Sequence, residues 1–162
     1  MDVISFSVDH RALKRGVYVS RRDFVCGHCV TTFDIRIKEP NREPVIDMPA
    51  LHTLEHLMAV YLRSADSGFA DELIYIGPMG CRTGMYMIAK GDLSSFDVLP
   101  VLKAAFGYIA DFKGEVPAAR PEQCGNYLEH NAAMAAYESR IFLEEILGKF
   151  GEENAAYTFL SD

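Results

Sequence analysis

The stretch MPALHTLEHLMAVYLR, residues 48–63, combines an apolar helical pattern with three ionisable side chains. Its apolar residues recur at the three- and four-residue spacing of a helix and form one stripe: Leu51, Leu54, Met58, Tyr61 and Leu62. Pro49 suits the first turn of such a helix, because proline lacks the N–H that this turn leaves unpaired. We therefore predict a helix from about residue 50 to residue 64, packed against a core.

His52, Glu55 and His56 interrupt this helix among leucines, where unpaired polar groups are costly. Helical residues four apart lie on one face, so His52 and His56 can chelate one metal ion. Glu55 points close to the same face and is placed to move protons beside that metal. The order H-x-x-E-H is also a known metal-site pattern. The alternative is a pair of surface histidines on an amphipathic helix, and the apolar neighbours favour the metal site.

A catalytic metal usually takes a third protein ligand and keeps one position open. The candidates for that ligand are Cys124, Cys81, His130 and Glu129. Cys124 precedes Gly125, which permits close backbone approach, and its thiolate would complete a set of two histidines and one cysteine. Cys81 lies in a glycine-containing loop beside Arg82, a neighbour that favours a reactive thiolate. A buried, inert cysteine is the alternative for Cys81.

Patterns elsewhere in the chain predict a mixed fold. Strands are expected at residues 2–8, 30–37, 72–77 and 85–91, and helices at residues 94–110 and 127–150. Residues 38–49 carry three prolines and are expected to form a loop. Strands and helices mix without strict βαβ alternation. We therefore expect an α+β fold, a single domain over residues 1–162 with a largely antiparallel sheet covered by helices in two layers.

Composition excludes several classes of function. A chain of 162 residues suits one domain, and its net charge of −7 without a basic block argues against nucleic acid or an anionic membrane as a partner. No apolar run approaches the roughly 20 residues of a membrane span. The N-terminus lacks the pattern of a signal peptide. We therefore expect a cytoplasmic protein.

The segment CGHC, residues 26–29, holds two of the four cysteines. A redox or metal-binding C-x-x-C is one interpretation, but a zinc ribbon needs a second such pair, which the sequence lacks. We favour a turn between two strands that happens to carry Cys26 and Cys29.

Five longer segments carry a more specific signal: SFSVDH (5–10), FDIRIKEPN (33–41), HTLEHLMA (52–59), GPMGCRTGMY (77–86) and EQCGNYLEHN (122–131). The combination of H-T-L-E-H, P-M-G-C-R-T-G and C-G-N-Y in this order is highly specific. Over nearly its whole length the chain resembles the S-ribosylhomocysteine lyase (LuxS) family, which makes the precursor of autoinducer-2.

The resemblance implies a homodimeric α+β enzyme with one metal per subunit, held by His52, His56 and Cys124. It implies Fe(II) as the metal, which zinc or cobalt can replace. It assigns general acid and base roles to Glu55 and Cys81. It also implies that three residues from the partner subunit line the substrate pocket: Ser5, His10 and Arg36.

Active sites shared between two subunits also fit the expected N-terminal strand, because a strand at a sheet edge readily extends into a partner subunit. Ser5 and His10 lie in this strand and the turn after it. A variant lacking His10 and a variant lacking Cys81 are then expected to restore activity when their subunits are mixed.

The implied reaction cleaves S-ribosyl-L-homocysteine to L-homocysteine and 4,5-dihydroxy-2,3-pentanedione, in the methyl cycle and in quorum sensing. A Lewis-acidic metal can polarise the sugar carbonyl and acidify the adjacent C–H. Proton transfers by Glu55 and Cys81 then move the carbonyl along the sugar, until homocysteine leaves by β-elimination. No organic cofactor is implied. Tyr75 departs from the family at a position where many members carry an acidic residue, which affects the grip on the amino-acid end of the substrate.

Two other functions compete with this interpretation. A small metallopeptidase of the H-x-x-E-H type would use Glu55 to activate water and Glu129 as its third ligand, but it leaves Cys81 without a role. A metal-buffering or redox-sensing protein would use the thiols, but it leaves Glu55, Arg36 and His10 unexplained.

Overall fold

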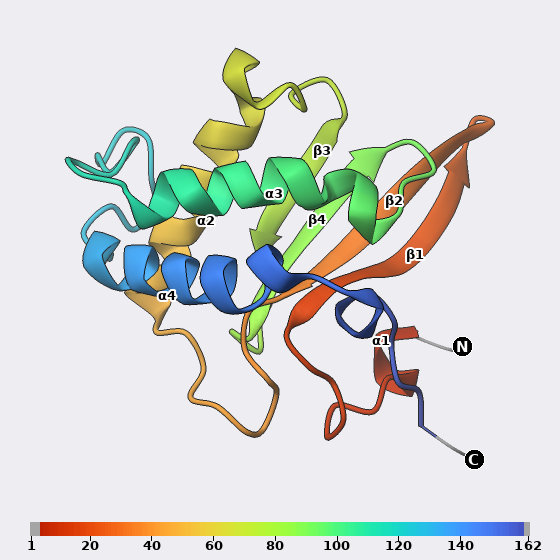
Figure 1. Ribbon diagram of the computed structural model, residues 1–162. Coiled ribbons are helices and arrows are strands. Elements are labelled where there is room, and N and C mark those ends of the chain that lie inside the picture. Colours follow the sequence, from red (N-terminus) through yellow and green to blue (C-terminus); the bar gives the residue numbers. More distant parts are fainter. Residues whose placement is uncertain (1–3, 161–162) are drawn as a thin grey trace.

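The structure, a computed structural model, describes residues 4–160, with side chains from residue 6 onward. Within these residues, four antiparallel strands form one sheet in the order β1-β2-β4-β3 (Figure 1). The strands are β1 (Gly16–Val25), β2 (His28–Arg36), β3 (Leu73–Pro78) and β4 (Gly84–Lys90). The strands expected at 30–37, 72–77 and 85–91 are confirmed as β2, β3 and β4.

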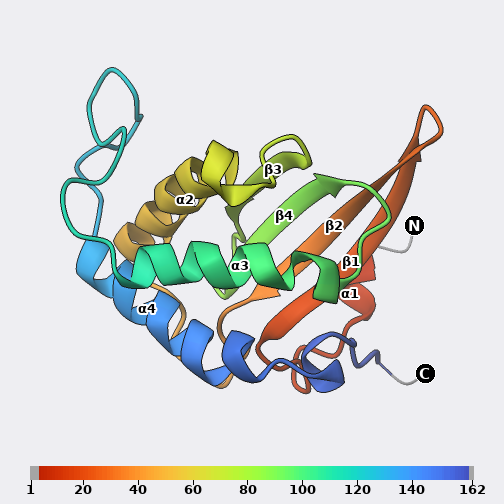
Figure 2. The ribbon, with the colours of Figure 1, turned by 45° about the horizontal axis from the view of Figure 1, so that its top comes forward.

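Three helices cover one face of this sheet, as Figure 2 shows: α2 (Met48–Arg63), α3 (Ser95–Ala110) and α4 (Ala132–Glu145). Side chains alternate along a strand, so every second residue points toward the helices. The core formed in this way includes Val17, Phe33, Ile35, Met85 and Met87 of the sheet and Leu54 and Met58 of α2. Shorter helical turns are α1 (Ile4–Ser7), η1 (Ala65–Ser67), η2 (Leu147–Lys149) and η3 (Glu152–Asn154).

The opposite face of the sheet carries polar and aromatic side chains. Tyr18, Asp34 and Tyr86 lie side by side in register across β1, β2 and β4. A small apolar cluster lies on this face and consists of Val8, Leu13, Tyr18 and Tyr157. The two ends of the chain meet beside it, where Val8 pairs with Phe159 in an isolated bridge. Figure 1 shows the first and last segments running next to each other.

We expected a strand at residues 2–8. This prediction is wrong for residues 4–8, and residues 2 and 3 lie outside the described part of the structure. Residues Ile4–Ser7 form the short helix α1, and the bridge from Val8 to Phe159 is isolated. Alternation over so few residues is a weak signal, because a strand also needs a neighbour along its length.

The final helix begins at Ala132 rather than at Tyr127. The side chain of Asn131 accepts a hydrogen bond from the Met134 N–H at 3.0 Å and caps the helix there. The backbone N–H of Asn131 donates to the Pro49 carbonyl oxygen at 3.1 Å. The segment before α4 is therefore tied to the start of α2 instead of continuing the helix.

The other expected helices are confirmed. Helix α2 begins at Met48 with Pro49 in its first turn, and α3 begins with a capping box between Ser94 and Asp97. The antiparallel sheet with helices on it confirms the α+β class. No helix within residues 4–160 is both long and apolar enough to cross a bilayer.

Candidate metal centre and catalytic site

The two histidines of α2 are oriented by carbonyl groups of remote loops. The ring centroids of His52 and His56 are 4.7 Å apart. His52 Nδ1 lies 2.9 Å from the carbonyl oxygen of Glu129, and His56 Nδ1 lies 2.7 Å from that of Pro117. A carbonyl oxygen only accepts, so each Nδ1 donates and each Nε2 keeps its lone pair. Metal-binding histidines are held in this way.

Cys124 lies in the loop before α4, and its sulfur lies close to the two histidines of α2. Its Sγ lies 3.3 Å from His52 Nε2. The backbone N–H of Asn126 donates to this sulfur at 3.4 Å. The N–H of Cys124 donates to the Arg120 carbonyl oxygen at 2.9 Å, so a backbone turn holds the cysteine in place.

His130 is the fourth group of the cluster. Its ring stacks on that of His52 with centroids 4.2 Å apart, and its Nδ1 lies 3.2 Å from the Thr53 hydroxyl. Its Nε2 is buried and finds no hydrogen-bond partner among the described residues. Burial lowers the pKa of His130, and repulsion from His52 and His56 when their rings are protonated lowers this pKa further. The imidazole therefore favours the neutral form that binds metals.

The four ligand atoms offered by His52, His56, Cys124 and His130 all lie within 4.8 Å of one another. Imidazole nitrogen and thiolate sulfur suit zinc and related transition metals rather than calcium or magnesium. The Nε2 of His130, without a hydrogen-bond partner among the described residues, belongs to a residue of the same group. The residues present thus fit a metal ion, and this is the one such group found in residues 4–160. Of the four candidates for the third ligand, Cys124 and His130 belong to the cluster.

Glu129 does not join this group, although a metallopeptidase would require it to do so. Its carboxylate accepts a hydrogen bond from the Asn126 side chain, and its contribution to His52 comes from its backbone carbonyl. The metallopeptidase interpretation therefore lacks its third ligand.

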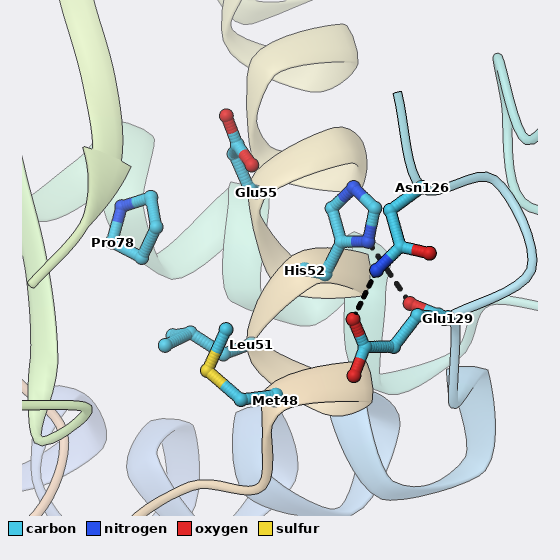
Figure 3. A pocket seen from close by; sticks show the side chains of 7 residues that line it. All are labelled: Met48, Leu51, His52, Glu55, Pro78, Asn126 and Glu129. Carbon is cyan, nitrogen blue, oxygen red and sulfur yellow. Dashed lines mark hydrogen bonds between the residues drawn. The ribbon is translucent and has the colours of Figure 1, made fainter. Parts of the chain in front are cut away.

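A pocket of about 220 Å³ opens beside the cluster (Figure 3). His52 and Glu55 project into it from successive turns of α2, and Pro78 faces them from the end of β3. The remaining lining residues are Met48, Leu51, Asn126 and Glu129. The half-buried Glu55 thus lies in the same pocket as a member of the metal cluster, as the helical spacing predicts.

A second pocket, of about 310 Å³, brings together His10, Arg36 and Cys81. Its other lining residues are Phe6, Met79, Gly80 and Tyr86, and none of them lines the first pocket. The side chain of Ser5 lies outside the described part of the structure. One chain therefore carries the candidate catalytic groups in two separate pockets, Glu55 in the first and Cys81 in the second.

The Cys81 sulfur is surrounded by donors. The Thr83 hydroxyl lies 3.1 Å from it, and Nη1 of Arg36 donates toward it at 3.7 Å. Burial raises the pKa of Cys81, but the hydrogen bonds from Thr83 and the charge of Arg36 outweigh burial, so this pKa lies below its ordinary value. The sequence pointed to Arg82 for this role, whereas the structure assigns it to Arg36.

The sequence did not single out Thr83 or Asp34, although a signal for both exists. Asp34 precedes Arg36 by two residues on β2 and therefore shares its face. The buried Asp34 forms an ion pair with Arg36 at 2.6 Å. Thr83 follows Cys81 by two residues, and its hydroxyl accepts a hydrogen bond from Arg36 at 2.5 Å.

Neither Tyr75 nor the CGHC segment belongs to the metal cluster or lines the pocket beside it. Val25 pairs with His28 across the turn that contains Cys26 and Gly27, both with positive φ, so CGHC is the expected turn between strands. Tyr75 lies on β3 with 48% of its surface exposed. Its ring covers Gly77, where a Cβ atom would meet the Tyr75 hydroxyl at 1.9 Å.

Comparison with known proteins agrees with this geometry. Residues 3–153 match the family model described as S-Ribosylhomocysteinase (LuxS). The chain is 53% identical to an S-ribosylhomocysteine lyase of Porphyromonas gingivalis strain W83, over 94% of this chain and 96% of that protein. It is 52% identical to the enzyme of that name in Phocaeicola vulgatus, over 94% of each chain. Identity to the one in Clostridium acetobutylicum is 46%, over 96% of this chain and 97% of the relative.

Proposed function

Since the chain belongs to the S-ribosylhomocysteinase (LuxS) family, we propose that it cleaves S-ribosylhomocysteine at a metal held by His52, His56 and Cys124. The products are L-homocysteine and 4,5-dihydroxy-2,3-pentanedione. One observation carries the proposal. Because carbonyl oxygens accept from both Nδ1 atoms, the Nε2 atoms of His52 and His56 keep their lone pairs, and both residues lie in one group of ligand atoms with Cys124.

A metal bound by these residues would supply the electrophile of the reaction. When bound, a divalent ion would polarise the carbonyl of the sugar and make the neighbouring C–H more acidic. We propose Fe(II), the metal that the resemblance to the family implies, with zinc or cobalt able to substitute; two imidazoles and one thiolate suit each of these metals. His130 stays outside the ligand set in this proposal, since a catalytic metal keeps one position open for its substrate.

Glu55 and Cys81 move the protons. Glu55 lies in the pocket of the cluster, where its carboxylate can take a proton from the sugar carbon and return it to the next one. Cys81 has a lowered pKa and serves as the second acid and base. Once the carbonyl stands two carbons away from the carbon that bears the sulfur, removal of the proton from the carbon between them expels homocysteine as a thiolate, which then takes up a proton. The enol left behind tautomerises to 4,5-dihydroxy-2,3-pentanedione. His10 and Arg36 would bind the substrate beside Cys81.

A homodimer would join the two pockets. Glu55 and Cys81 act on one sugar in this proposal, yet they line separate pockets of one chain. A two-fold interface that sets the metal pocket of one subunit against the Cys81 pocket of its partner would form two complete sites. We further propose that the protein is cytoplasmic and that its product serves quorum sensing.

Thiol release tests the proposed activity. Protein loaded with Fe(II) under anaerobic conditions is expected to release homocysteine from S-ribosylhomocysteine, as detected with a thiol reagent. Treatment with a chelator should abolish release, and added metal should restore it. Folded, metal-loaded protein that releases no thiol would contradict the proposal.

Subunit mixing tests the shared site. Cys124→Ala and Cys81→Ala proteins are each expected to be inactive. After subunit exchange their mixture should recover about a quarter of the parent activity, because about half of the dimers are mixed and one site in each is intact. A mixture that stays inactive despite exchange, confirmed by native mass spectrometry, would place every catalytic group in one chain.

The control for this experiment is a mixture of His10→Ala and Cys81→Ala proteins. The sequence suggested that these two variants would complement each other. Since His10 and Cys81 line the same pocket of one chain, no mixed dimer of them has an intact site, and this mixture should stay inactive.

A further inference from the structure

Tyr157 lies in the C-terminal segment, four residues beyond the part of the chain that matches the family model. Its hydroxyl donates to Oδ2 of Asp34 at 2.8 Å. Its ring stacks on that of Tyr18, with centroids 4.6 Å apart and planes inclined by 10°. Burial raises the pKa of Tyr157, and the charge of Asp34 raises it further, so the hydroxyl keeps its proton and remains a donor.

This hydroxyl is the first member of a chain of contacts that ends at Cys81. Oδ2 of Asp34 also accepts from Nη2 of Arg36 at 2.6 Å. Nη1 of the same guanidinium donates to the Thr83 hydroxyl at 2.5 Å and toward the Cys81 sulfur at 3.7 Å. One planar group thus connects Asp34 on one side with Cys81 and Thr83 on the other, so its orientation determines how well it stabilises the thiolate.

The carboxylate of Asp34 needs a second donor. Asp34 and Arg36 are both buried, and Oδ1 of Asp34 finds no hydrogen-bond partner among the described residues. In a buried setting an under-solvated carboxylate draws the guanidinium toward itself. The Tyr157 hydroxyl bonds this carboxylate and reduces that pull, which leaves more of the charge of Arg36 available to Cys81.

We propose that Tyr157 is a positioning residue for the Cys81 thiolate, acting through Asp34 and Arg36. The C-terminal segment thereby becomes part of the acid–base machinery without touching the substrate. The proposal rests on the role of Cys81 under the proposed function, but it concerns the state of the thiol, which can be measured without turnover.

Other groups also face Cys81. Arg36 comes from β2, Tyr86 from β4 and His10 from the segment after α1, and all three line its pocket. Arg82 is its neighbour in the chain. A substitution at Tyr157 removes none of these side chains, so a shift in the titration of Cys81 after that substitution reports on the contact between Tyr157 and Asp34.

The test is the pH dependence of Cys81 alkylation in the full chain. Brief iodoacetamide treatment at a series of pH values, followed by mass mapping, gives the midpoint for this thiol. The parent should titrate below the pH of about 8.5 that is ordinary for cysteine. Tyr157→Phe keeps the ring but loses the hydroxyl. It is expected to raise the midpoint by about half a pH unit, a roughly threefold loss of thiolate at acidic pH.

Tyr18→Phe is the matched control. It removes another buried hydroxyl from the same cluster, but this hydroxyl donates to the Lys14 carbonyl oxygen at 2.9 Å and not to Asp34. The midpoint of Cys81 alkylation in Tyr18→Phe should equal that in the parent. An unchanged or lowered midpoint in Tyr157→Phe would overturn the proposal, as would equal shifts in both variants, which would indicate a general loosening of the cluster. Failure of the thiol-release assay would instead contradict the proposed function.

Discussion

Cys124→Ala is expected to yield folded protein that no longer holds stoichiometric metal. The variant removes the only thiolate of the cluster and leaves imidazoles alone around the ion. Losing an outer partner of a metal ligand costs about 10- to 100-fold in affinity, and loss of a ligand itself should cost at least as much. Metal analysis of anaerobically purified protein measures the effect, and circular dichroism checks the fold.

Cys29→Ala is the control for this loss. Cys29 is half-buried like Cys124, but it lies on the β1–β2 hairpin rather than in the cluster. This variant should bind metal like the parent. A full complement of metal in Cys124→Ala would refute the ligand assignment.

Cys81→Ala and Glu55→Gln are expected to keep their metal and lose activity. Each removes a group that carries protons and leaves the ligand cluster unchanged. General acid–base catalysis contributes about 10²- to 10⁴-fold, so homocysteine release should fall by that factor in each variant. The measurement is steady-state thiol release at equal metal content.

The matched control is Cys26→Ala, which removes an exposed cysteine like Cys81 from the hairpin turn. Its activity should equal that of the parent. Parent-like turnover in Cys81→Ala or in Glu55→Gln would show that the residue concerned has no catalytic role.

Local pattern alone predicted α2 and the placement of three of its side chains. A spacing of four residues puts His52 and His56 on one face of any α-helix, whatever packs around it. The same reasoning predicted β2, β3, β4 and α3, but it did not predict β1. It failed at residues 4–8, where the chain forms α1 and then a single bridge, and at residues 127–131, where Asn131 bonds to Pro49. At residues 127–131 a contact with a remote segment outweighs the local preference, whereas residues 4–7 have no neighbouring strand to pair with in the described part of the chain and Val8 forms only an isolated bridge.

The sequence by itself determined the class of the fold and the chemistry of H-x-x-E-H, because helical and strand periodicity are properties of short segments. Only the tertiary structure decided which remote groups join them. Cys124 meets His52 across 72 residues, and His130 brings a ring nitrogen to the same cluster. Arg36 reaches Cys81 although Arg82 is its neighbour in the chain, because the pairing of β2 with β4 sets Arg36 opposite Gly84. Such contacts depend on sheet register and on loops that close over long distances, and no short pattern encodes either.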